Sequence, residues 1–266
     1  MIDNIALLKA IRAKKPLVHH ITNWVTIYDC ANIVRAIGAL PVMAHAKEES
    51  AEMQAISSSL VLNIGTLSPE LVESMILAAK KANELKHPIV LDAVGAGATK
   101  LRTDKALEIM NSVHVDIVKG NCSEIAKLAG SDVLTKGVEA TEVKGDLSAI
   151  AKELAKKHDC TVVVTGAEDI VASAKGTGFL VKNGHSMLGE FVGTGCMAAS
   201  LLGCFAAVEE NYAIAGAAAL SCFGIAAELA SKKATKPAAF KQELFDQLYS
   251  LSQADANKLQ KIDVLE

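Results

Sequence analysis

Residues 60–97, LVLNIGTLSPELVESMILAAKKANELKHPIVLDAVGAG, place two short apolar runs on either side of one long helix-like segment. The runs Leu60–Ile64 and Pro88–Leu91 are rich in Val, Ile and Leu, a composition typical of strands that are buried on both faces. The segment between them, Ser68–Leu85, opens with a serine followed by a proline, which is a common helix start. Strand, helix and strand in this order predict a βαβ unit with two parallel strands.

The same alternation extends over most of the chain. Further strand-like runs lie at Leu17–His20, Val115–Lys119 and Thr161–Thr165, and helix-like runs lie at Tyr28–Ile37, Thr103–Asn111, Cys122–Ala129 and Asp146–His158. After residue 165 the pattern changes to a predicted hairpin of Ile170–Ser173 and Gly178–Val181, followed by three helices. The sequence therefore predicts an α/β fold, with a mostly parallel central sheet covered by helices on both faces. No Pro- or Ser-rich linker divides the 266 residues, so we predict one domain, residues 1–266.

Composition and charge narrow the class of protein. The formal net charge is −3 and no basic stripe occurs, which argues against a nucleic-acid partner. Six scattered cysteines without a C-x-x-C motif indicate reduced thiols and a cytoplasmic protein, and residues 1–16 predict an amphipathic helix rather than a targeting peptide. Two uncharged stretches, residues 191–208 and 211–227, are interrupted by glycine and polar residues, so we predict buried helices and no membrane span.

Polar or glycine-rich turns follow the five predicted strands that precede the hairpin. They are Thr22-Asn23 and residues 63–66 (NIGT), 92–97 (DAVGAG), 119–124 (KGNCSE) and 165–168 (TGAE). Ligands of open parallel sheets bind outside the carboxyl ends of the strands. We therefore expect these turns to gather at one rim of the sheet and to line a binding site.

A glycine loop supplies a second candidate site. Residues 193–196, GTGC, lead directly into the helix-forming residues MAASLL, so the loop's backbone N–H groups should converge at a helix N-terminus. Such a terminus attracts anions, phosphoryl groups in particular. The loop also fits the dinucleotide pattern G-x-G-x-x-A, but no second strand with an acidic end follows about 20 residues later. A Walker loop, G-x-x-x-x-G-K-[ST], does not occur in the sequence.

Seven segments of the chain, taken in order, resemble one family. They are LVHHITNWV (17–25), LPVMAHAKEE (40–49), LVLNIGTL (60–67), LDAVGAGAT (91–99), VKGNCSEI (118–125), VVTGAEDIV (163–171) and VGTGCM (192–197). Together they resemble the hydroxyethylthiazole kinases of thiamine biosynthesis, members of the ribokinase-like superfamily, over about residues 5–250. The resemblance implies a ribokinase-like fold and phosphorylation of the primary alcohol of 4-methyl-5-(2-hydroxyethyl)thiazole by ATP with Mg²⁺. It also implies a homotrimer with active sites at the subunit interfaces.

Carried over position by position, the resemblance implies several groups of site residues. The substrate contacts are Met43 and Gly193, with Asn23 and Thr66 as further walls of the same pocket. The ATP contacts are Lys119 and Thr165, and the acids on the magnesium and phosphate side are Asp92 and Glu124. The catalytic group consists of Gly193, Thr194, Gly195 and Cys196, the last matching the family's active-site cysteine.

The chemistry of these residue types agrees with the implied roles. Phosphoryl transfer needs positioning and neutralisation of charge, which loop N–H groups and a lysine supply, while carboxylate oxygens suit Mg²⁺ directly or through water. Cys196 stands where most ribokinase-like kinases carry an aspartate base. A thiol is a weak base at neutral pH, and we expect the helix N-terminus to lower the pKa of this one. We therefore expect Cys196 to assist modestly.

The sequence departs from the family's usual residues at three positions. Val192 replaces a threonine, which removes a hydroxyl beside the substrate or phosphate, and Ala93 replaces a proline. Lys119 replaces an arginine, which keeps the positive charge but loses the bidentate fork. We expect these changes to affect the fit of the substrate in the pocket and the turnover rate more than the class of reaction.

Other functions share parts of this pattern. Kinases of hydroxymethylpyrimidine or pyridoxal, and the ADP-dependent lyases that repair hydrated NADH, usually carry an acidic residue where this chain has Cys196. Because Val192 and Lys119 depart from the family's usual residues, a non-catalytic protein that binds nucleotide or thiazole stays open as an alternative. A cysteine hydrolase is disfavoured because no histidine has a sequence context that ties it to Cys196. No histidine shows metal-ligand spacing either, which argues against zinc.

Overall fold

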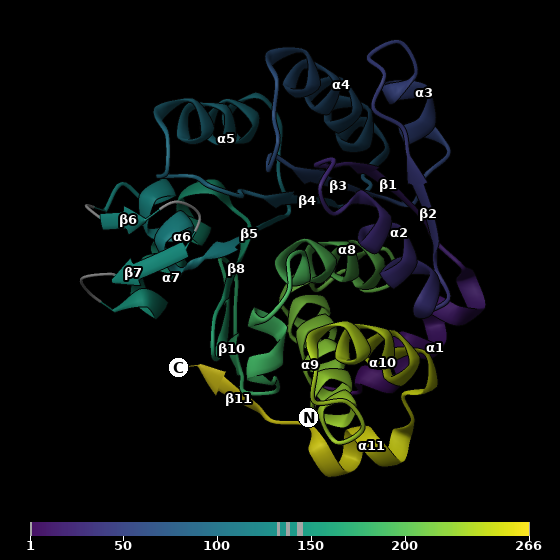
Figure 1. Cartoon of the computed structure of the whole chain (residues 1–266). Coiled ribbons are helices and arrows are strands. Elements are labelled where there is room, and N and C mark those ends of the chain that lie inside the picture. Colours follow the sequence, from purple (N-terminus) through teal and green to yellow (C-terminus); the bar gives the residue numbers. More distant parts are fainter. Residues whose placement is uncertain (1, 132–133, 137–138, 143–145, 266) are drawn as a thin grey trace.

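The protein is a nine-stranded sheet covered by helices, seen in a computed structural model that describes residues 2–131, 134–136, 139–142 and 146–265 (Figure 1). The strand order is β11-β10-β9-β8-β5-β4-β3-β1-β2. The parallel strands are β1 (Leu17–Ile21), β2 (Leu40–Met43), β3 (Ser59–Asn63), β4 (Ile89–Asp92), β5 (Ile117–Asn121) and β8 (Thr161–Thr165). The antiparallel strands are β9 (Asp169–Ser173), β10 (Gly178–Val181) and β11 (Ile262–Leu265). The predicted mostly parallel sheet and the β9–β10 hairpin are confirmed.

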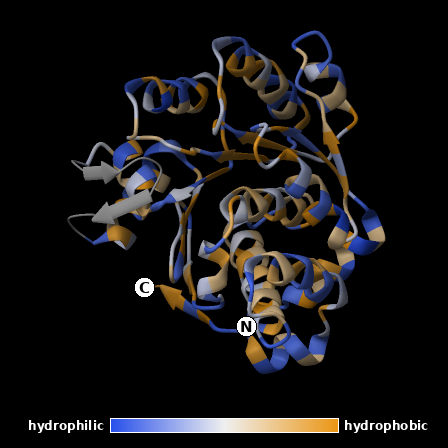
Figure 2. Ribbon diagram, viewed as in Figure 1, coloured by the Kyte–Doolittle hydropathy of each residue, from blue (hydrophilic) through white to orange (hydrophobic). Residues whose placement is uncertain are grey.

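Helices pack on both faces of the sheet, as predicted. One apolar core lies against α1 (Asn4–Lys14), α2 (Ile27–Ala36), α8 (Thr194–Ala206), α9 (Tyr212–Ser231), α10 (Pro237–Ser250) and α11 (Gln253–Leu259). The other lies against α4 (Pro69–Leu85), α5 (Lys100–Ser112), α6 (Cys122–Leu128) and α7 (Leu147–His158), with α3 (Ser50–Ala55) packed on α4. In Figure 2 the strands between the two layers are largely apolar, as expected for strands covered on both sides.

Several elements differ from the prediction. The strands β2 and β11, the helix α3 and the small antiparallel pair β6 (Leu134–Lys136) and β7 (Glu139–Glu142) were not predicted. The prediction of three helices after the hairpin is wrong: the described residues there form four α-helices, a 3₁₀ helix η1 (Ser186–Gly189) and β11. The additional helix, α11, is short and polar, and a capping box of Ser252 and Asp255 holds its first turn.

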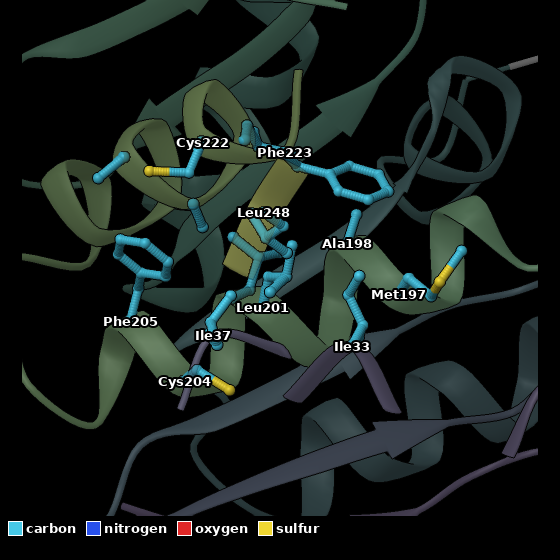
Figure 3. Close-up of a cluster of buried hydrophobic side chains, with 14 of the residues drawn as sticks. Ile33, Ile37, Met197, Ala198, Leu201, Cys204, Phe205, Cys222, Phe223 and Leu248 are labelled. Atoms are coloured by element: carbon cyan, nitrogen blue, oxygen red, sulfur yellow. The ribbon is translucent and has the colours of Figure 1, made fainter. Parts of the chain in front are cut away.

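The two uncharged stretches form α8 and α9, which share the larger core (Figure 3). In Figure 3, Leu201 and Phe205 of α8, Phe223 of α9 and Ile33 of α2 belong to one apolar cluster. Helix α9 is long and apolar enough to cross a membrane, but 83% of its most apolar window is buried inside the protein. Both stretches are therefore buried helices, as the sequence predicts.

Gly203 allows α8 to lie close to the sheet at strands β3 and β1. A Cβ atom at this position would be 2.4 Å from Val61 Cγ2 on β3. We therefore expect Gly203→Ala to lower the free energy of unfolding by about 1–3 kcal/mol, because the helix or the strand must shift. Urea denaturation followed by circular dichroism measures this change.

Gly216→Ala in α9 is the matched control. A Cβ atom at Gly216 would meet nothing closer than Val171 Cγ1 at 3.4 Å, an ordinary contact. Since alanine is the better helix former by about 0.5–1 kcal/mol, this variant should be at least as stable as the native protein. Equal losses of stability in the two variants would contradict the packing argument.

Candidate active site

A cavity of about 800 Å³ lies at the carboxyl ends of the parallel strands, against the N-terminus of α8. Four of the five predicted turns contribute to its wall through Asn23, Gly65, Thr66, Lys119, Asn121, Glu124, Thr165 and Gly166. From the fifth turn, residues 92–97, Val94 reaches the wall. The polar turns thus gather at one rim, and the loop of residues 192–196 closes a second side of the cavity.

The glycine loop opens α8 without a side-chain cap. Gly193 precedes the helix with a φ of +107°, a left-handed conformation that favours glycine. Because glycine offers no side-chain acceptor, the N–H groups of the first turn are not capped by the residue that starts the helix. Thr194, Gly195 and Cys196 line the cavity, and the loop packs closely on Thr26. This terminus is therefore suited to bind an anion.

A buried ion pair lies directly against this loop. Lys119 Nζ is 2.9 Å from Asp92 Oδ1, and the two side chains are 5% and 0% exposed. A Cβ atom on Gly195 would be 3.0 Å from Lys119 Nζ, so the ammonium group touches the loop. Burial lowers the pKa of Lys119, but the carboxylates of Asp92 and Glu124 outweigh burial and raise it, so the lysine keeps its charge. The loop thus combines backbone N–H groups with a fixed cation.

Glu124 joins two loops at the cavity wall. Its Oε1 accepts a hydrogen bond from the Gly95 N–H at 2.7 Å, and its Oε2 accepts one from the Asn121 N–H at 2.7 Å. The second bond belongs to a capping box, because the Asn121 side chain accepts in return from the Glu124 N–H. Burial raises the pKa of Glu124, and the nearby Lys119 opposes that shift.

The two acids that the resemblance implies for magnesium differ in their access to the cavity. Asp92 is not among the lining residues, and Asn63 and Lys119 occupy its two oxygens. Glu124 lines the wall, with both oxygens engaged by backbone N–H groups. Within the described residues, no group of three or more His, Cys, Asp or Glu side chains could hold a metal ion. These residues fit a Mg²⁺ ion that keeps water and phosphate oxygens as ligands, not a cage of protein ligands.

Cys196 lines the cavity and is half-buried. Its Sγ accepts hydrogen bonds from Asn23 Nδ2 at 3.4 Å and from Asn63 Nδ2 at 3.3 Å. Burial and the nearby Asp92 carboxylate raise the pKa of the thiol, although Lys119 and hydrogen bonds with the side chains of Thr26 and Asn23 act in the opposite direction. The expectation that the helix N-terminus lowers the pKa of this thiol is therefore wrong, because burial dominates.

The remaining predicted site residues fall into two groups. Asn23, Thr66 and Thr165 line the cavity, and the Thr66 hydroxyl accepts a hydrogen bond from the Trp24 N–H at 3.2 Å. Met43 is not among the lining residues, since it ends the edge strand β2 and is half-buried there. Within one chain, the structure does not bring Met43 to the predicted pocket.

One wall of the cavity was missed by the sequence analysis. It is formed by residues 183–186 and by Leu220 and Phe223 of α9. Helix α9 is apolar on all sides, so its sequence does not show that Leu220 and Phe223 line a cavity while their neighbours belong to the core. Asp169 also lines the cavity, and burial raises its pKa to about 6. The sequence analysis expected the NIGT turn to line a binding site but assigned Asn63 no role of its own, although a polar residue at a strand end was the available signal.

A doubly covered parallel sheet with an uncapped glycine loop and a fixed lysine at its rim defines a phosphotransferase of ribokinase-like fold. The model of the hydroxyethylthiazole kinase family matches residues 8–254. Hydroxyethylthiazole kinase of Methanosarcina mazei is 56% identical over 258 residues, covering 97% of this chain and 98% of that protein. The structure of the hydroxyethylthiazole kinase protein from Pyrococcus horikoshii OT3 has a TM-score of 0.91 and 42% identity over 100% of both chains. The chain belongs to the hydroxyethylthiazole kinase family and is a kinase.

More distant proteins share the fold alone. The ADP/ATP-dependent NAD(P)H-hydrate dehydratase from Bacillus subtilis is 12% identical, with a TM-score of 0.61 over 90% of both chains. Among the alternatives that the sequence raised, membership of the kinase family therefore favours a kinase over the lyase and over a cysteine hydrolase.

Proposed function

We propose that this enzyme transfers the γ-phosphoryl group of ATP to the primary alcohol of 4-methyl-5-(2-hydroxyethyl)thiazole, in thiamine biosynthesis or salvage. Beyond the membership of this kinase family, the proposal rests on one arrangement of residues at the start of α8. The glycine loop at the start of α8 has the thiol of Cys196 at its end and the ammonium group of Lys119 against Gly195. A phosphoryl group on the loop therefore meets a base and a cation at once.

The loop and the lysine supply what phosphoryl transfer needs. The N–H groups of residues 194–196 hold the γ-phosphoryl oxygens as negative charge develops. Lys119 adds positive charge that needs no rearrangement, because Asp92 already holds it in place. Cys196 accepts the proton of the substrate alcohol, and the alcohol oxygen bonds to phosphorus as the bond from phosphorus to the ADP oxygen breaks.

The two ends of the cavity suit the two substrates. Leu220 and Phe223 provide an apolar surface for the base of the nucleotide, and Thr165 at the end of β8 provides a hydroxyl to the same cavity. Asn23 and Thr66 border the thiazole at the strand ends near Cys196. Mg²⁺ bound to the triphosphate would supply charge neutralisation there, and Glu124 at the cavity wall would hold it through water, while Asp92 fixes Lys119 from behind the wall.

Release of ADP from Mg·ATP tests the proposed function. The purified protein is compared with hydroxyethylthiazole, hydroxymethylpyrimidine, pyridoxal or no acceptor. Release with the thiazole alone, together with its phosphate ester by mass spectrometry, is the expected result. Release with a different alcohol would reassign the substrate of the pocket, and no release in a protein that binds ATP would favour a non-catalytic binder.

The proposal includes a cytoplasmic homotrimer with active sites at the subunit interfaces. Trp24, Val25 and Tyr28 are 62–77% exposed along one segment, and Val25 and the exposed Val192 line the cavity. A second copy packed here would cover these apolar side chains and bring its edge-strand Met43 to the pocket. All six cysteines lie within the described residues and carry free thiols, which supports a reducing compartment. Light scattering should give the mass of three chains, and the mass of one chain would contradict the shared pocket.

A further inference from the structure

Asn63 is a buried polar side chain that connects the sheet to the first turn of α8. It is the last residue of β3 and is 1% exposed. The parallel pairing of β3 with β4 puts Asn63 beside Asp92, which ends the neighbouring strand. From this position the amide reaches Asp92 on one side and Cys196 on the other.

The Asn63 amide makes all four hydrogen bonds of which it is capable. Its Oδ1 accepts from Asn23 Nδ2 at 3.0 Å and from the Gly65 N–H at 2.9 Å. Its Nδ2 donates to Asp92 Oδ2 at 2.7 Å and to Cys196 Sγ at 3.3 Å. Because a backbone N–H only donates and an ionised carboxylate only accepts, this network fixes the orientation of the amide.

Two amide groups hold the sulfur of Cys196 from the strand side. Asn23 Nδ2 is the second donor, and its orientation is fixed as well, since Asn23 Oδ1 accepts from the N–H groups of Val25 and Thr26. The Thr26 side chain is a third hydrogen-bond partner of the thiol. Because Cys196 also lines the cavity, the sulfur held by these contacts can face a bound alcohol.

We propose that Asn63 is a positioning residue for phosphoryl transfer, which holds the Cys196 sulfur toward the acceptor alcohol and ties it to the Lys119–Asp92 ion pair. The inference rests on the proposed function, in which Cys196 takes the proton of the alcohol. The amide positions the base through its hydrogen bond to Cys196 Sγ, and it positions the Lys119 ammonium group through its hydrogen bond to Asp92. Such a link matters because a misplacement of about 1 Å can lower a rate about 10²-fold.

A double-mutant cycle on kcat tests this role. Asn63→Ala is expected to lower kcat about 10²-fold, with KM for either substrate changed less than about threefold. In enzyme that already carries Cys196→Ala, the same substitution should lower kcat less than about tenfold, because the sulfur is gone and only the contact of Asn63 with Asp92 remains. An equal fall in both backgrounds would overturn the proposal, since Asn63 would then act without the sulfur.

Asn83→Ala is the control for the loss of an amide side chain that connects two segments of the chain. The Asn83 side chain binds the backbone N–H and C=O of His114, each at 2.9 Å, and it does not line the cavity. We expect this variant to keep the native kcat. A loss of kcat like that of Asn63→Ala would attribute the effect to general loosening of the fold and would count against a positioning role.

Alkylation of Cys196 in the variant Asn63→Asp gives a second test, which depends neither on catalysis nor on the stability of Asn63→Ala. Asn63→Asp keeps the shape of the side chain and the acceptor for Gly65, but it replaces the shared donor to Cys196 and Asp92 by an oxygen. Residue 63 and Asp92 then share one proton, which lies between their carboxyl groups and leaves no donor for the sulfur. Alkylation of Cys196 by iodoacetamide at about pH 8, followed by peptide mass spectrometry, should slow at least about tenfold, because the thiolate loses a donor. An unchanged rate would overturn the proposal even in an active enzyme. A slower rate in a protein that phosphorylates no alcohol would support the sulfur contact and refute the proposed function alone.

Discussion

Lys119→Met is expected to lower the free energy of unfolding by about 3–5 kcal/mol, because it leaves Asp92 unpaired in the interior. Asp92 is 0% exposed, and the lysine ammonium is the cation that neutralises it. The variant should also lose phosphoryl transfer, since the positive charge against Gly195 disappears. Urea denaturation of both proteins measures the stability, and ADP release measures the activity.

The stability of Lys119→Met should depend on pH in a defined direction. Burial already raises the pKa of Asp92 against the opposing effect of Lys119, so removal of the lysine raises it further. The folded variant then binds a proton that the unfolded chain has released. Its stability is therefore highest at low pH and is lost as the pH rises through the folded pKa. The difference from the native protein should be larger at about pH 8 than at about pH 5.

The double variant Lys119→Met with Asp92→Asn separates stability from catalysis. With both charges removed, most of the lost stability should return and the pH dependence of the single variant should disappear, because no unpaired titrating carboxyl is left. Activity should stay absent, since the ammonium group beside the loop is not restored. A loss of less than about 1 kcal/mol in the single variant would show that the pair is of little consequence for the fold.

Cys196→Ala is expected to lower kcat about 10²-fold, the lower end of the range for general-base assistance. The thiol must lose its proton to act as a base, and burial raises the pKa of Cys196 above its ordinary value. The kcat of the native enzyme should therefore rise with pH through the alkaline range. Steady-state assays from about pH 6 to about pH 10 measure this profile.

Cys196→Asp tests the assignment of the base from the opposite direction. A carboxylate is ionised at lower pH than a thiol, so this variant should stay active and its kcat should be flat from about pH 7 to about pH 9. The alkaline rise should be absent from Cys196→Ala as well. A folded Cys196→Asp without activity, or an alkaline rise that persists in Cys196→Ala, would argue against the thiol as the base.

Local signals in the sequence predicted the frame of the fold well. Ser68 caps α4 by accepting from the Leu71 N–H, and Asn121 with Glu124 forms the capping box of α6. These features depend on neighbours within three residues, which a sequence displays directly. The edge strands β2 and β11 were missed because each is short and interrupted, by Pro41 in one and by Asp263 in the other.

The chemistry of the site depends on contacts that the sequence does not display. Asp92 and Lys119 were assigned separate roles, yet they lie on neighbouring strands and form one ion pair. The pKa of Cys196 was expected to fall at a helix N-terminus and instead rises, since burial and the nearby carboxylate outweigh Lys119 and the hydrogen bonds to the thiol. Asn63 became visible only through partners 29 and 133 residues away along the chain.

The position of α8 makes the active site dependent on the whole chain. This helix packs against β1, β3 and β4, so residues 194–206 must return to strands formed by the first 92 residues. Contacts so distant in sequence form only after long loops have closed, and they are lost together when the chain opens. A ligand in the cavity should therefore raise the unfolding temperature, and thermal unfolding with and without Mg·ATP is expected to report occupancy of the site.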